Sequence, residues 1–185
     1  MTWVLLTVAA LVALVVFIYN RLIRDRNRVD AAWGDIDVQL QRRHDLVPQL
    51  VKAVDQYARY ERATLEAVTE LRAEAMHQAG VRARGDAEEK LGAGIERLLA
   101  LAESYPDLKA NQNFLQLQNE LVETENYLQF ARRYYNASVR DYNTMRESVP
   151  SNIVAGSFGF GPRDFFQKSS DEAANVPLAR FGRVE

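Results

Sequence analysis

The sequence contains no cysteine and only two histidines among its 185 residues. The lack of cysteine excludes disulfide bonds, zinc sites built from thiolates and thiol nucleophiles. Basic and acidic side chains nearly balance, with 23 Lys and Arg against 25 Asp and Glu, so no net charge favours nucleic acid or an acidic substrate. A chain of this length suits one domain with a single sizeable core.

The first 20 residues, MTWVLLTVAALVALVVFIYN, lack any charged side chain. As a helix, the stretch from Thr2 to Tyr19 is roughly 27 Å long, close to the ~30 Å core of a bilayer. Trp3 and Tyr19 lie at its two ends, where amphipathic rings favour the membrane interface. A cleaved signal peptide fits poorly, because no basic residue precedes the apolar run and no small-residue cleavage site follows it. We therefore predict that residues 1–20 are a retained transmembrane anchor and that the lipid bilayer is a partner.

Four arginines directly follow this span, namely Arg21, Arg24, Arg26 and Arg28. Cytoplasmic flanks of membrane spans carry the excess of Lys and Arg. This pattern predicts a single-pass protein with its N-terminus outside and its soluble domain in the cytoplasm.

Strand-like alternation is not evident before the C-terminal tail, whereas apolar residues recur at heptad spacing. Steps of seven give two rows over residues 30–78: Trp33, Leu40, Val47, Val54, Glu61, Val68 and Ala75, and Ile36, Arg43, Leu50, Tyr57, Thr64 and Leu71. The polar members make this a bundle face rather than a clean zipper. The pattern predicts one long helix that ends near Gln78, with Gly80 and Gly85 as breakers.

Two further helices are predicted. The first spans residues 86–104, with Asp86 as N-cap, Glu89 as capping-box partner, and Gly92 and Gly94 allowing close packing. The second spans about 107–148, with Asp107 as cap. Its two rows pair large with small residues: Phe114, Leu121, Leu128, Tyr135, Tyr142 and Val149, and Leu117, Thr124, Ala131, Ser138 and Met145.

The chain is therefore predicted to be all-α: an N-terminal transmembrane helix (1–20), then an antiparallel three- to four-helix bundle with coiled-coil-like long helices (21–150). Residues 151–185 are expected to form a Gly- and aromatic-rich loop and a docked or disordered tail. The short second helix cannot cover the seam between two long ones. Either a long helix is split and folded back, or apolar surface remains for another copy of the chain, which predicts a homo-oligomer.

The stretch RRHDLVPQLV, residues 42–51, places a proline inside a helical pattern. Pro48 cannot donate a hydrogen bond to the carbonyl of His44, so a continuous helix would be kinked there. If Asp45 caps a new helix, Pro48 takes its third position, where no intrahelical partner is needed. We predict a bend or break within residues 43–48 and interpret the charged cluster as a joint rather than a catalytic site.

The sequence resembles the LemA family of bacterial membrane proteins. Four motifs carry the resemblance: RRHDLVPQLV (42–51), YPDLKANQNFLQLQNEL (105–121), ENYLQFARRYYNASVRDYN (125–143) and PSNIVAGSFGF (150–160). It implies a single-pass protein of the bacterial inner membrane with a helical soluble domain and no established enzymatic activity. The motif residues expected to be structurally important are Arg43, Asp45, Leu46, Pro48, Leu50, Tyr105, Pro106, Asp107, Phe114, Leu117, Leu121, Arg132, Tyr135, Asn136, Tyr142, Asn143 and Pro150.

Chemistry of a conventional kind is not indicated. Glu74 and His77 form half of a ferritin-like di-iron pattern, but a second Glu-x-x-His is missing. The glycines of residues 156–161 lack the preceding strand and following helix of a phosphate loop. We therefore predict no catalytic residues, no metal and no cofactor.

Two functions remain open. The first is a membrane-anchored scaffold or adaptor that acts by self-association and by binding an unknown membrane or cytoplasmic protein, with no catalytic activity of its own. The alternative is a regulatory subunit or cofactor of a membrane enzyme such as a protease. The cationic and aromatic residues around Arg132 and Tyr135 fit a binding face, although edge residues of a bundle have the same composition.

Overall fold

A computed structural model describes residues 1–58 and 60–166, and within these ranges every regular element is an α-helix. The predicted all-α class is confirmed. The helices are α1 (Thr2–Asp55), α2 (Arg62–His77), α3 (Val81–Ala102), α4 (Pro106–Lys109), α5 (Gln112–Glu147) and α6 (Ser151–Ser157).

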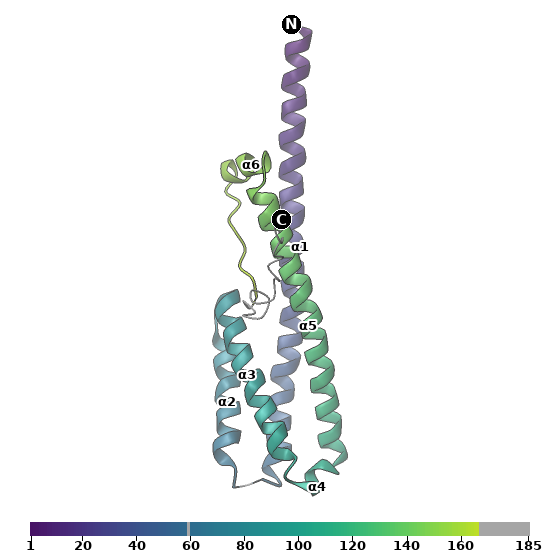
Figure 1. The fold of residues 1–185 in the computed structure, drawn as a ribbon, viewed down its shortest axis with the longest axis vertical. Helices are drawn as coiled ribbons and strands as arrows, with labels where there is room; N and C mark the ends of the chain where they lie inside the picture. The colour runs from purple at the N-terminus through teal and green to yellow at the C-terminus, as the bar shows by residue number, and fades with distance from the viewer. Residues whose placement is uncertain (59, 167–185) are drawn as a thin grey trace, which may run out of the picture.

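The bundle is built on α1, which runs the whole length of the molecule (Figure 1). Helix α5 returns antiparallel along α1, and the hairpin of α2 and α3 packs beside the half of α1 that is distant from the N-terminus. The first 17 residues of the chain extend beyond the body with all their side chains exposed. By length and composition, this apolar part of α1 is able to cross a membrane.

The predicted single helix over residues 30–78 is wrong, because the chain turns back between Asp55 and Arg62. No glycine or proline signals this turn. It allows Leu65, Val68 and Ala75 of α2 to pack in the core with α3, whereas a straight helix would leave them in water. Of the two options that the helix lengths left open, the split and folded-back helix is the one observed.

Several predicted helix ends also move. Helix α3 begins five residues before Asp86, and Gly85 is a buried helical residue rather than a breaker. Asn111, not Asp107, caps α5, with its side chain accepting from the amides of Asn113 and Phe114. Asp107 belongs instead to the single turn of α4, whose Leu108 is fully buried.

Two apolar clusters form the core. One joins α1 from Leu46 onward to α2, α3, α4 and the start of α5. The other joins residues 18–40 of α1 to the second half of α5, α6 and the chain that follows it. The predicted α5 row holds: Phe114, Leu121, Leu128, Tyr135 and Tyr142 are all buried, whereas Val149 is exposed. Between the clusters lies a polar layer at Arg43 and His44.

After α5 the chain does not form the expected loop throughout. Pro150 precedes the short helix α6, and residues 160–166 then run back along α1 and α5 toward the α2–α3 hairpin (Figure 1). This returning segment covers the part of the α1–α5 seam that the short hairpin does not reach. The predicted tail beyond residue 166 lies outside the described residues.

Candidate functional site

Helix α1 passes through Pro48 without interruption, so the predicted break and the new helix capped by Asp45 are wrong. The proline still leaves the carbonyl of His44 without its usual intrahelical donor. Arg72 of α2 supplies the missing bond, donating from Nε to the His44 oxygen over 2.7 Å. The proline therefore creates an acceptor on α1 that attaches α2.

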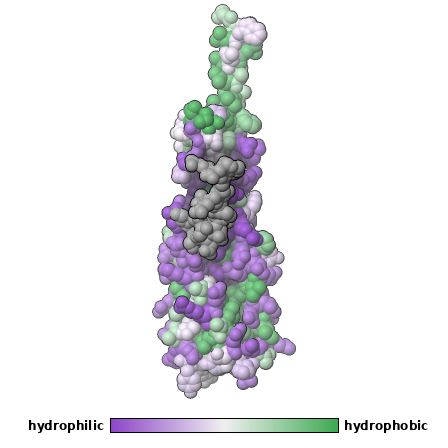
Figure 2. Space-filling model, in the orientation of Figure 1, coloured by the Kyte–Doolittle hydropathy of each residue, from purple (hydrophilic) through white to green (hydrophobic). Residues whose placement is uncertain are grey.

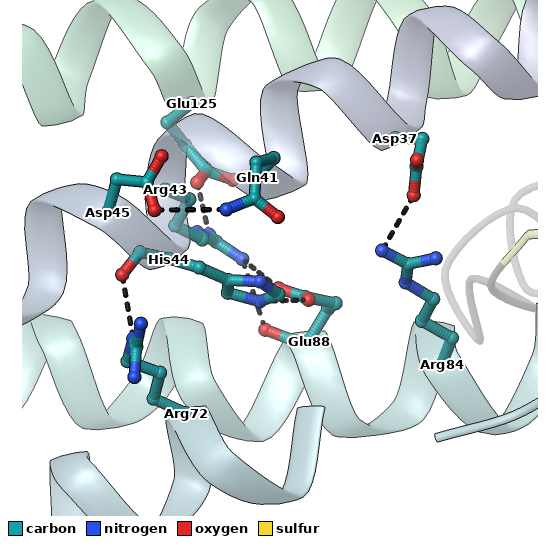
Figure 3. Close-up of polar contacts among 9 residues, drawn as sticks. All are labelled: Asp37, Gln41, Arg43, His44, Asp45, Arg72, Arg84, Glu88 and Glu125. Atoms are coloured by element: carbon teal, nitrogen blue, oxygen red, sulfur yellow. Dashed lines mark hydrogen bonds and ion pairs between the residues drawn. The ribbon is translucent and has the colours of Figure 1, made fainter. Parts of the chain in front are cut away.

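Arg43 and His44, just before Pro48, form an ion cluster with the buried Glu88 of α3 and the partly exposed Glu125 of α5 (Figure 3). His44 Nε2 lies 2.7 Å from Glu88 Oε1, and Arg43 Nη1 lies 3.2 Å from Glu88 Oε2. Arg43 also donates to the backbone carbonyl of Glu88 and pairs through Nη2 with Glu125 of α5. Arg43 and His44 thus hold α1 to α3 and α5 at one level.

Glu88 is fully buried. Burial alone would raise the pKa of its carboxyl, but the hydrogen bond and charge of His44, together with Arg43, outweigh burial and lower it. Glu88 is therefore a carboxylate at neutral pH. A carboxylate can only accept, so His44 Nε2 must carry the proton in their hydrogen bond. The three donor groups, His44 Nε2 and the two Nη atoms of Arg43, all have acceptors on Glu88 or Glu125. Such pairing is the condition for burying charge at tolerable cost.

A groove opens beside this cluster, between α3 and α5. It encloses about 460 Å³, and its lining includes Arg43, Glu88, Gly92, Glu125 and Arg132. A Cβ on Gly92 would lie 3.4 Å from Arg43 Nη2, so Gly92 lies directly against the guanidinium as it crosses toward α5. The groove is charged at its floor and is open to solvent along its length.

A second arrangement holds the segment that follows α6 against α5. Asn143 donates from its side-chain amide to the carbonyl of Arg163 and accepts from the amide of the same residue, over 2.9 and 3.0 Å. Asn136 makes the same pair of bonds with Phe166, over 3.1 and 3.0 Å. The hydroxyls of Tyr142 and Tyr135 donate to the carbonyls of Gly161 and Asp164. These four side chains form what we call the Tyr–Asn clamp.

The spacing of the clamp matches two geometries. Within α5, Tyr–Asn occurs twice, seven residues apart, which is about 10.5 Å along a helix. Asn143 binds Arg163 and Asn136 binds Phe166. These two bound residues are three positions apart, which is about 10 Å in an extended segment. The repeated Tyr–Asn pairs of α5 therefore bind the backbone of residues 161–166 and not its side chains. Phe166, fully buried at the end of the segment, packs on Trp33 with Arg132 5.3 Å from its ring.

A third feature is an exposed aromatic strip on the edge that α1 and α5 share, formed by Val38, Tyr127, Phe130 and Tyr134. These residues border a shallow hollow of about 360 Å³. The side chain of Phe130 is 63% exposed, and the Arg133 guanidinium lies 4.7 Å from its ring. Exposed aromatic rings with arginine are the composition of interface centres.

The motif residues predicted from the sequence thus separate into groups. Arg43 lies in the ion cluster, Pro48 creates the acceptor for Arg72, and Arg132 contacts Phe166. Tyr135, Asn136, Tyr142 and Asn143 form the clamp, which binds this chain's own segment. The remaining apolar members, Leu46, Leu50, Phe114, Leu117 and Leu121, belong to the core together with Tyr105.

Sequence reasoning missed two partners of this site. The sequence does not distinguish the buried Glu88 from the exposed acids Asp86 and Glu89 beside it, and the predicted start of this helix was different. No sequence pattern indicates that Arg72 binds the His44 carbonyl. Glu74 pairs with Lys90 over 3.1 Å and not with a metal ligand. Among residues 1–58 and 60–166, no three His, Asp or Glu side chains lie together in a way that could hold a metal ion.

Comparison with known proteins places these features in context. The family model described as LemA family matches residues 32–181. Magnetosome protein MamQ 2 of Paramagnetospirillum magneticum is 26% identical over 199 aligned residues, which cover 94% of this chain and 72% of that protein. Protein LemA of Metamycoplasma hominis is also 26% identical, over 85% of this chain and 72% of its own length.

Proposed function

The chain belongs to the LemA family, and on that premise we propose that it is a membrane-tethered helical scaffold that self-associates and docks protein partners. In this proposal α1 crosses the bilayer, the bundle is the binding module, and the molecule has no catalytic activity of its own. The names of the matched family and relatives carry no enzymatic meaning.

The observation that carries the proposal is the aromatic strip. Val38, Tyr127, Phe130 and Tyr134 remain exposed although both helices that bear them have a well-packed opposite face. A contiguous apolar patch of this kind favours a protein contact. Aromatic rings bury a large area at low entropy cost, so few residues suffice to hold a weak dimer together.

A second copy of this chain fits the strip because of how the molecule is tethered. Two copies anchored in one membrane are related by a twofold axis along the membrane normal, which brings the same edge of each molecule face to face. The strip lies along the α1–α5 edge, nearly parallel to α1, and is therefore able to meet its own copy. Tethering in the same bilayer also raises the effective concentration of the two copies.

Mass photometry of the full-length protein in detergent micelles across a concentration series tests self-association. The wild type is expected to form dimers, and the variant Phe130→Gln with Tyr134→Gln is expected to dissociate with a Kd at least about tenfold higher, since hot-spot aromatics contribute more than ~1.4 kcal/mol. Met76→Gln, which alters an exposed apolar residue on α2, is the matched control. A wild type that stays monomeric throughout would contradict the proposal.

Membrane orientation belongs to the same proposal. The four arginines after the span support a cytoplasmic bundle in the bacterial inner membrane. Because the chain has no cysteine, Thr2→Cys and Lys109→Cys give single reporters at opposite ends of the molecule. In intact cells an impermeant maleimide is expected to label position 2 and to spare position 109. The reverse pattern would overturn the orientation.

The groove between α3 and α5 favours a second candidate, a regulatory subunit of a membrane enzyme. Its charged floor and open length suit a partner segment with polar side chains. If this second candidate is right, the protein is expected to form a stoichiometric complex with an enzyme. Glu125→Gln, in the groove, is expected to weaken that complex, and Phe130→Gln, on the aromatic strip, is expected to leave it unchanged. Loss through Phe130→Gln alone would instead favour the scaffold.

A further inference from the structure

The short helix α6 and its flanks present an apolar surface that faces neither the core nor the aromatic strip. Val149, Ile153 and Phe158 are 80%, 67% and 57% exposed, whereas Val154 and Ala155 on the other face of α6 are buried. Helix α6 and its flanks therefore have apolar side chains on the exposed side as well as on the buried side, and the fold of a single copy does not explain the exposed ones.

This surface lies where α1 leaves the body. Phe158 and Phe160 pack edge-on against Tyr19, with their ring centroids 5.0 and 5.6 Å from that of Tyr19. Tyr19 is the last but one residue of the charge-free N-terminal stretch. Phe17 is exposed, but Ile18 and Leu22 are buried among residues of the body. Figure 1 shows α6 at the end of the body from which the bare part of α1 projects, and Figure 2 shows hydrophobic atoms continuing from that stalk onto the adjoining end of the body.

Charge is distributed in the same way. Residues 149–162, VPSNIVAGSFGFGP, contain no charged side chain. The exposed arginines Arg21, Arg24 and Arg28 lie at the neighbouring level of α1, within a few turns of Tyr19. Arg21 and Arg28 also pair with Asp25, and Arg24 lies between them. An uncharged apolar surface beside exposed basic side chains is typical of a segment that rests in the interface of an anionic membrane.

We propose that the α6 surface, formed by Val149, Ile153 and Phe158, is a second membrane contact that inserts among lipid headgroups beside the α1 span. The inference rests on the proposed membrane anchoring and extends it. Lipid is the occupant because the patch is continuous with the apolar span and at the level where headgroups surround it. A helix embedded at the interface keeps its backbone hydrogen bonds satisfied, so insertion needs no refolding.

The consequence is mechanical. A single span leaves the bundle free to swivel and tilt about the membrane surface. A second contact on α6 fixes the tilt of the bundle, because α6 is joined to α5 by the residues around Pro150 and to α1 through Tyr19. The aromatic strip is then presented at a fixed angle to neighbouring copies, which lowers the orientational cost of docking.

Depth-resolved quenching tests the contact on the full-length protein in vesicles of phosphatidylcholine and phosphatidylglycerol. Single cysteines at Ile153, Leu11 and Lys109 carry an environment-sensitive fluorophore, and doxyl-labelled lipids are the quenchers. Leu11 is expected to be strongly quenched, Ile153 to reach at least half of that quenching, and Lys109 to remain unquenched. Phe158→Asp, in a second variant, is expected to lower the quenching at position 153 without altering that at position 11.

The quenching results separate failure of the α6 contact from failure of the membrane anchoring. Quenching at Leu11 with none at Ile153 overturns the α6 contact and leaves the anchoring intact, whereas no quenching at Leu11 overturns both. A blue-shifted fluorophore at Ile153 that lipid quenchers do not reach means that protein covers the patch, and this too overturns the proposal.

Discussion

Replacing Glu88 by glutamine tests whether the ion cluster holds the bundle together. Glu88 is fully buried and accepts from His44 over 2.7 Å and from Arg43 over 3.2 Å. Glutamine keeps the volume but removes the charge, and its amide group must direct N–H toward one of two donors. Arg43 then keeps a single anionic partner, Glu125, which is partly exposed, together with the backbone carbonyl of residue 88.

The magnitude follows from the cost of unpairing a buried charge. Breaking one partner of such a pair costs about 3–5 kcal/mol. For a chain of this size each kcal/mol lowers the Tm by about 2–4 °C, so Glu88→Gln is expected to lose roughly 6–20 °C. Thermal melts of the full-length protein in detergent, followed by far-UV circular dichroism, measure it.

Glu96→Gln is the matched control, because Glu96 is an exposed acid on the same helix. It is expected to change the Tm by no more than a degree or two, as surface substitutions usually do. If Glu88→Gln and Glu96→Gln melt alike, the cluster does not stabilise the bundle and the reasoning is wrong.

The pH dependence of the Tm provides a second test of the role of Glu88. The pKa of Glu88 is lowered in the folded state relative to an unfolded value of about 4.3. Its contribution to stability is therefore complete above that unfolded value and is lost as pH falls through the lower folded pKa. The Tm gap between wild type and Glu88→Gln is expected to be constant near neutrality and to shrink in acid below pH ~4. A gap that stays unchanged throughout acid titration would show that the Glu88 carboxylate is not its cause.

Three further predictions concern the other contacts. Arg72→Met is expected to cost about 1–3 kcal/mol in urea unfolding, and about 1 kcal/mol less in a Pro48→Ala background, because alanine restores the amide that the His44 carbonyl lacks; equal costs would contradict this. Asn143→Ala is expected to increase hydrogen exchange at the Arg163 amide, whose bond it removes, and unchanged protection would refute the clamp. Burial raises the pKa of Tyr135 to about 12, so the difference in phenolate absorbance between wild type and Tyr135→Phe is expected to rise near pH 12. The neutral hydroxyl stabilises the fold below the unfolded pKa of about 10, and this stabilisation is lost as pH rises toward 12. A titration midpoint near pH 10 would contradict the burial of Tyr135.

The helical class and the core rows could be predicted because heptad spacing records which face of a helix is buried. Leu40, Val47, Val54, Phe114 and Leu121 were placed correctly for that reason. The turn after Asp55 could not be predicted, because it contains no glycine or proline and depends on apolar contacts that α2 makes only after the chain folds back. Local signals fail where tertiary packing decides the geometry.

The polar layer shows a different limit. Arg43 looked like a fault in an apolar row, and it is instead the residue that joins three helices. Its partner Glu88 lies 45 positions away, so no local pattern could pair them. The Tyr–Asn clamp was more accessible, because the repeat at 135–136 and 142–143 is visible in the sequence and has helical spacing. What it binds needed the course of residues 160–166.

Cysteine crosslinking in native membranes tests the central claim, self-association along the aromatic strip, most directly. With no other cysteine in the chain, Phe130→Cys and Tyr134→Cys report only that surface, and Arg97→Cys on exposed α3 reports random collision. The account predicts a disulfide-linked dimer at Phe130→Cys or Tyr134→Cys and monomer at Arg97→Cys. Equal yields at the strip and at Arg97, or monomer at all three positions, would contradict it.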